Sequence, residues 1–190
     1  MRLAATLIAL VLASVCAASG VAAGAPKDPM SLVLRKADFP AGTAYEADDG
    51  DYTQFKYRLD AGGVSFESAT FQGISSSSAK GSLYITGSVF VTPSVAQAKK
   101  GFTLMKSRKE FFWAPTMRSL SLPSYGDQQY VLHDPAGGEG IWTANVVVRN
   151  RATLWALRVL SERRPAISKA EFLASVNTYA RKQRARVGGG

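Results

Sequence analysis

Apolar and polar residues alternate along several stretches of the chain, and this pattern predicts an antiparallel sheet. Residues 64–71 and 82–91 are rich in strand-forming side chains. Residues 128–133, 141–149 and 152–160 alternate in the same way and are separated by turn-forming residues. Because three strands follow one another with short turns between them, the sequence predicts a C-terminal three-stranded meander.

The same period of two predicts which side chains of the meander face the core. The expected core positions on its middle and last strands are Trp142, Ala144, Val146 and Val148, and Trp155, Leu157 and Val159. The serine-rich residues 74–81 are expected to form a polar loop between the first two strands.

Residues 51–59 fit two different elements. Tyr52, Phe55 and Leu59 would share one face of a helix. In the same residues, Phe55, Tyr57 and Leu59 alternate as they would along a strand. Both assignments therefore stay open from the sequence.

Three helices are expected from their start signals, each of which pairs a capping residue with a residue of the first turn. These pairs are Asp28–Pro29, Ser94–Gln97 and Ser168–Glu171. The first helix is expected to stop before the turn at 39–42, and the last to stop at Gly188. The expected buried stripes of the second and third helices are Val95, Ala98, Phe102 and Met105, and Phe172, Val176, Tyr179 and Ala180.

Strands in hairpin order, framed by helices at both ends and with one helix between them, predict an α+β fold. The expected architecture is a mostly antiparallel sheet with the C-terminal meander. An N-terminal helix, a central helix and a long C-terminal helix flank that sheet.

The first 23 residues have the composition of a secretory signal peptide. Arg2 is followed by a long run of apolar and small residues, and Val21-Ala22-Ala23 supplies the small residues that a signal peptidase needs. Cleavage before Gly24 would leave a single α+β domain over 24–190. The protein is therefore expected to be secreted or associated with the cell envelope, without a transmembrane span after processing.

Cys16 is the single cysteine of the chain and lies inside the signal segment. Lipid attachment at Cys16 would need a small residue before it, and Val15 breaks that pattern. Cleavage before Gly24 would leave a domain without cysteine, which excludes disulfides and thiolate metal sites.

The net charge is +9, and it is concentrated at the C-terminal end. Residues 149–190 carry ten basic and two acidic side chains. Four of the basic residues crowd the end of the last helix, where they complement the helix dipole. Outside a cell, their partner would be an anionic envelope surface rather than nucleic acid. The candidate anionic-surface residues are Arg181, Lys182, Arg184 and Arg186.

The sequence offers little catalytic or metal-binding chemistry. His133 is the single histidine and is expected on the surface at the end of a strand. The acidic residues in 46–51 do not have the spacing of a calcium-binding loop. No catalytic, cofactor-binding or metal-ligating residue is therefore assigned, and no cofactor is expected.

Three adjacent aromatic residues, Phe111, Phe112 and Trp113, lie in a long stretch without a clear period. They would either pack this connection onto the core or line a pocket that contacts a ligand or partner. They are kept as candidate contact residues.

Four segments carry a resemblance that frames nearly the whole domain: LVLRKADFPAG, TPSVAQAKKGF, LPSYGDQQYVL and YARKQRARVG. Together they resemble a loose group of secreted and lipid-anchored actinobacterial proteins of unknown function. The resemblance implies a PsbP/Mog1-like α/β sandwich and supplies no catalytic residues.

The resulting hypothesis is a non-enzymatic exported domain that binds a ligand or partner at the cell envelope. A carboxylate-dependent envelope hydrolase and a purely structural envelope protein are the alternatives. The sequence does not give the ligand or the oligomeric state.

Overall fold

The computed structural model describes residues 27–39, 54–77, 81–107, 117–134, 141–162 and 167–188. Within these residues, seven strands form one sheet in the order β1-β2-β3-β7-β6-β5-β4. All neighbouring strands are antiparallel. The predicted signal peptide (1–23) and its cleavage point at Gly24 lie outside the described residues.

The strands are β1 (Gln54–Ala61), β2 (Val64–Ser77), β3 (Gly81–Val91), β4 (Arg118–Ser119), β5 (Gln128–His133), β6 (Ile141–Asn150) and β7 (Thr153–Glu162). The helices are α1 (Pro29–Leu32), the 3-10 helix η1 (Lys36–Asp38), α2 (Val95–Ser107) and α3 (Lys169–Gly188). Within the described chain this is the predicted α+β fold, with β5, β6 and β7 as the C-terminal meander.

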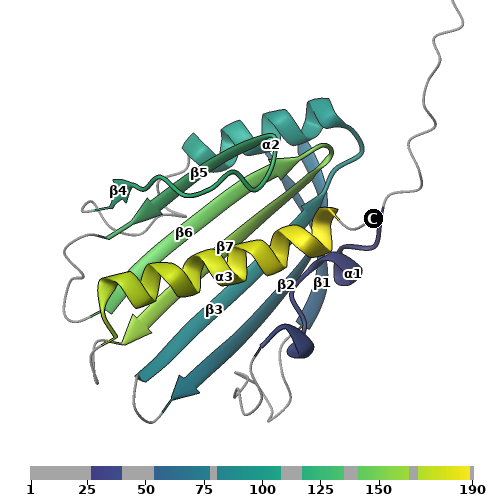
Figure 1. Cartoon of the computed structure of the whole chain (residues 1–190). Coiled ribbons are helices and arrows are strands. Elements are labelled where there is room, and N and C mark those ends of the chain that lie inside the picture. Colours follow the sequence, from purple (N-terminus) through teal and green to yellow (C-terminus); the bar gives the residue numbers. More distant parts are fainter. Residues whose placement is uncertain are drawn as a thin grey trace, which may run out of the picture.

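Helices cover both faces of the sheet (Figure 1). Neighbouring residues of β7 show this division, because Leu154 and Trp155 are both fully buried but belong to different clusters. Trp155 lies in the cluster that includes α3 and α1, whereas Leu154 packs with Phe102 of α2. The sheet is thus the middle of three layers, with an α3 side and an α2 side.

The α3 side holds the larger core. Most of the predicted meander positions belong to it as buried residues, and so does the predicted stripe of α3. Trp155 is fully buried, whereas Trp142 is partly buried and its ring stacks 6.3 Å from that of Phe172. Trp155 is thus the stronger of the two predicted core anchors.

One buried side-chain amide joins the N-terminal segment to α3 through two hydrogen bonds. Gln183 of α3 is fully buried, and its Nε2 donates to the carbonyl of Leu32 at 2.8 Å. Its Oε1 accepts from the backbone N–H of Leu34 at 3.2 Å. These two bonds position η1, which follows directly, beside the C-terminal end of α3.

The capping signals predicted the helix starts correctly. Ser168 and Glu171 form a reciprocal box, with bonds of 3.0 Å and 3.2 Å between each backbone N–H and the other side chain. Asp28 accepts from Met30 N at 3.3 Å at the start of α1.

Among the described residues, no helix is long and apolar enough to span a membrane.

The open assignment of residues 51–59 is settled in part, since Gln54–Ala61 form strand β1. Two expectations are wrong. The polar loop expected over 74–81 is wrong for residues 74–77, which belong to β2, and for Gly81, which begins β3. The first helix has four residues instead of extending toward Phe39, because the chain turns extended at Val33.

Val95 is exposed, at 44%, although the helical period placed it in the buried stripe of α2. The reason is its position as the first residue of α2. Side chains of a helix tilt toward its N-terminus, so that of Val95 extends beyond the layer that α2 covers.

Candidate functional site

The four candidate cations of α3 lie on different sides of its last turns. Arg181 and Arg184 are exposed, whereas Lys182 and Arg186 are half-buried. Lys182 and Arg186 are four residues apart and therefore share one side of the helix. The structure thus divides the predicted set into two pairs.

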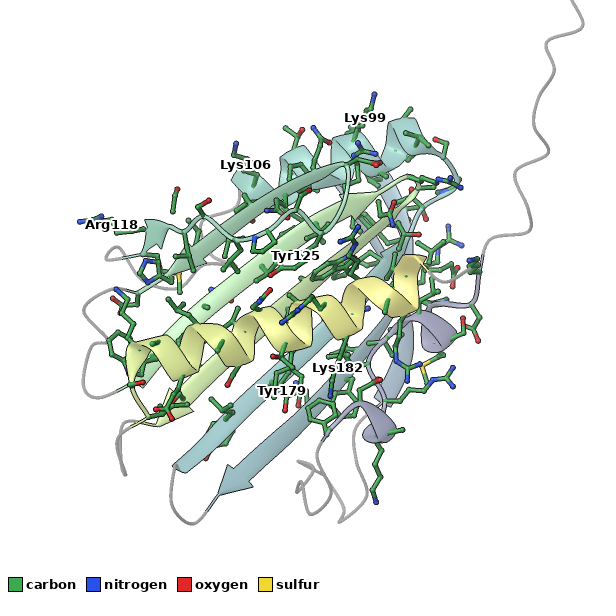
Figure 2. The ribbon with its side chains drawn as sticks, in the orientation of Figure 1. Lys99, Lys106, Arg118, Tyr125, Tyr179 and Lys182 are labelled. Atoms are coloured by element: carbon green, nitrogen blue, oxygen red, sulfur yellow. The ribbon has the colours of Figure 1, made fainter. Side chains whose placement is uncertain are left out.

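Lys182 and Arg186 point toward η1 and meet Asp38 there. Lys182 Nζ donates to the backbone carbonyl of Asp38, and Arg186 Nε donates to its carboxylate Oδ2. Lys182 Nζ also lies 5.6 Å from the ring centre of Tyr179, and Figure 2 labels both residues. These two cations fasten the N-terminal segment to α3 in addition to raising the local positive charge.

Arg181 and Arg184 face solvent on the side of the segment that leads into β5. Arg184 Nη1 donates to the carbonyl of Ser124 at 3.3 Å. Burial raises the pKa of Tyr125, and the positive charge of Arg181 opposes that shift. The hydroxyl of Tyr125 donates to Asn177 Oδ1 at 2.6 Å, and its ring is buried in the core.

Two further cations join this region from the other end of the chain. Arg35 and Lys36 are exposed, and the backbone N–H of Arg35 donates to Asp38 Oδ2 at 2.7 Å. The same carboxylate thereby joins η1 to the end of α3. We call the resulting group the basic end; it consists of Arg35, Lys36, Arg181, Lys182, Arg184 and Arg186.

The C-terminal charge run does not predict that Arg35 and Lys36 belong to the basic end. They lie within residues 24–60, which carry five basic and seven acidic side chains, so no basic excess singles them out. Only the fold brings this pair to α3, because the contact between Asp38 and Arg186 joins residues far apart in sequence.

His133 is buried, at 8% exposed, so the expectation of a surface histidine is wrong. It ends β5, and Lys169 at the start of α3 is near enough for its charge to act on the imidazole. Burial lowers its pKa below 6.5; the charge of Lys169 lowers it further, and Asp134 opposes the shift. A neutral imidazole at the end of a strand follows from this environment.

A pocket of about 380 Å³ opens between the β1–β2 turn and the start of α2. Its lining residues are Asp60, Ala61, Gly62, Gly63, Val64, Ser65, Pro93 and Gln97. Asp60 is the one carboxylate in this lining and forms an exposed ion pair with Arg58 at 3.4 Å. The pocket therefore does not contain the pair of carboxylates that glycoside hydrolysis uses.

In the part of the chain that the structure describes, no three His, Cys, Asp or Glu side chains are placed to hold a metal ion. The aromatic candidates Phe111, Phe112 and Trp113 lie outside the described residues. Their role as ligand or partner contacts stays a prediction.

Comparison of the chain with protein-family models, with curated proteins and with solved structures returns no match. The resemblance to secreted actinobacterial proteins with a PsbP/Mog1-like fold therefore stays a prediction. Any function must be argued from the arrangement of the side chains themselves.

Proposed function

We propose that this protein is a non-enzymatic exported domain that binds the anionic phospholipid surface of a cell envelope through the basic end. The observation that carries the proposal is the meeting of two chain segments around Asp38. The side chains of Lys182 and Arg186 and the backbone N–H of Arg35 bond Asp38 there, and the exposed Arg181 and Arg184 lie on another side of the same turns of α3.

The arrangement suits a surface better than a pocket. Arg35, Arg181 and Arg184 are exposed, so they can reach headgroups without leaving the fold. Lys182 and Arg186 are held by Asp38, and their charge adds to the field that the exposed cations present. A Lys or Arg near an anionic membrane contributes about 1 kcal/mol, and this attraction weakens as salt screens it.

Export follows from the signal-peptide pattern of residues 1–23 and is part of the proposal. Cleavage before Gly24 would deliver the domain outside the cytoplasm, where phospholipid headgroups are an abundant anionic surface. N-terminal sequencing of exported protein tests this step. The expected first residue is Gly24, and an acylated Cys16 at the terminus would contradict it.

Cosedimentation with vesicles tests the binding. All described elements lie within 27–188, so a chain that begins at Gly24 retains them. It is mixed at low salt with vesicles of equal parts phosphatidylglycerol and phosphatidylcholine, and with vesicles of phosphatidylcholine alone. Binding to the anionic vesicles is expected, with loss at high salt.

The decisive variant replaces three of the four exposed cations of the basic end with glutamine: R35Q/R181Q/R184Q. It leaves the contacts of Asp38 intact and is expected to weaken binding by roughly tenfold or more, since three charges are removed from one surface. The control variant R58Q/R118Q/K169Q removes the same charge at scattered exposed positions. Equal affinities of the two variants would show that net charge, and not the basic end, determines binding.

A further inference from the structure

The solvent face of α2 is a second cationic surface. Lys99, Lys100 and Lys106 are all exposed, and α2 contains no acidic residue. Figure 2 shows Lys99 and Lys106 on the outer side of α2, pointing away from the sheet. We call these three residues the α2 lysine face.

Among the described residues, the lysines of this face have no acidic partner that neutralises them. Exposed helices commonly pair Glu with Lys at four-residue spacing, and α2 lacks such pairs. In the described ranges, none of the three lysines forms an ion pair. Val95 precedes Lys99 by one helical turn and adds an exposed apolar side chain at the same end of the helix.

The two cationic surfaces lie on opposite sides of the molecule. The basic end belongs to α3 and η1 on one side of the sheet, and the α2 lysine face belongs to the helix that covers the other side (Figure 1). The sheet and one layer of core side chains on each of its faces separate them. A single flat membrane can therefore contact one of these surfaces but not both at once.

We propose that the protein uses both surfaces together and bridges two anionic phospholipid bilayers. This inference rests on the proposed function, since the basic end supplies the first contact. The α2 lysine face supplies the second contact, with Lys99 and Lys106 directed at the headgroups of the opposite bilayer and Lys100, whose Nζ lies beside Gly63 of the β1–β2 turn, at the edge of the face. Three lysines contribute on the order of a hundredfold in membrane partitioning at low salt, which is enough for a second, weaker contact.

Clustering of small vesicles distinguishes bridging from simple binding. The chain that begins at Gly24 is added at low salt to vesicles of equal parts phosphatidylglycerol and phosphatidylcholine. Particle size is followed by dynamic light scattering, and binding by cosedimentation. The wild-type protein is expected to bind and to increase particle size severalfold, and added salt is expected to reverse the increase.

Removing either surface should abolish clustering but leave binding through the other. The variants K99Q/K100Q/K106Q and R35Q/R181Q/R184Q are each expected to bind without clustering, the second more weakly than the first. The control variant R58Q/R118Q/K169Q, with the same change of net charge, is expected to cluster vesicles as the wild type does. A variant with both triple substitutions should bind no better than the wild type binds phosphatidylcholine vesicles.

Two results would overturn the bridging model while leaving the proposed function intact. One is wild-type binding without clustering. The other is undiminished clustering by K99Q/K100Q/K106Q, which would show that copies of the protein associate through another surface. Absence of wild-type binding to the anionic vesicles would overturn the proposed function as well.

Discussion

Replacing Gln183 with leucine tests the link that positions the basic end. The Gln183 amide is fully buried and bonds the carbonyl of Leu32 and the N–H of Leu34, both of which belong to buried residues. Leucine is similar in size, so the substitution leaves little cavity and removes both hydrogen bonds.

The expected cost follows from the two backbone groups that lose their partner. A buried polar group left unsatisfied costs about 1–3 kcal/mol, so the loss of two partners in Q183L is expected to lower the free energy of unfolding by about 2–6 kcal/mol. In a chain of this size, each kcal/mol lowers the melting temperature by about 2–4 °C, which gives a decrease of roughly 4–24 °C.

Thermal and urea unfolding followed by circular dichroism measure this cost. The matched control is Q97L in α2, because Gln97 Oε1 has no hydrogen-bond partner in the described structure. The control is expected to unfold at or slightly above the wild-type temperature. Hydrogen exchange at the Leu34 amide should accelerate in Q183L alone. If Q183L unfolds at the wild-type temperature and the Leu34 amide exchanges at the wild-type rate, the Gln183 side chain does not hold the N-terminal segment against α3.

Three further predictions, tested with five substitutions, concern the packing and its pH dependence. Trp155→Ala is expected to cost about 3–5 kcal/mol and Trp142→Ala less, because Trp142 is partly exposed; equal losses in denaturant titrations would contradict this order. Burial lowers the pKa of His133 in the fold, so the unfolded chain binds more protons at acidic pH. The stability that is present above pH 6.5 is therefore lost as the pH falls toward the folded pKa. The variant H133Q should lose less stability than the wild type between about pH 8 and pH 5. A Cβ at Gly126 would lie 2.6 Å from the carbonyl oxygen of Arg149, so G126A should cost about 1–3 kcal/mol, whereas G188A, with nothing within 4 Å, should be neutral in the same titration.

Much of the fold could be predicted because it depends on local patterns. The period of two identified the strands of the meander and the faces of Trp155 and Leu157. The capping residues Ser168 and Glu171 fixed the start of α3 to the residue. Both signals depend on residues within a few positions of one another.

The remaining features depend on contacts between distant segments. His133 is buried at the end of β5, and the charge of Lys169 at the start of α3 acts on it, which the strand pattern alone does not show. Asp38 joins η1 to α3 across a long sequence separation, so Arg35 was not expected in the candidate site. The hydroxyl of Tyr125 donates to Asn177 of α3, which is also distant in sequence.

The α2 lysine face illustrates how charge counted along the chain differs from charge counted over a surface. Residues 61–148 carry seven basic and five acidic side chains, so the segment is nearly balanced in sequence. Three of its basic residues project from one helix that has no acidic residue. The nearly balanced count over the long segment therefore conceals a local concentration of positive charge on α2.

The affinity of the chain that begins at Gly24 for anionic vesicles, measured against salt, tests the central claim most directly. The proposed function predicts binding at low salt that falls steeply as salt rises, with R35Q/R181Q/R184Q weaker than R58Q/R118Q/K169Q at every salt concentration. Failure of the wild type to bind at low salt, or equal affinity for phosphatidylcholine vesicles, would contradict it.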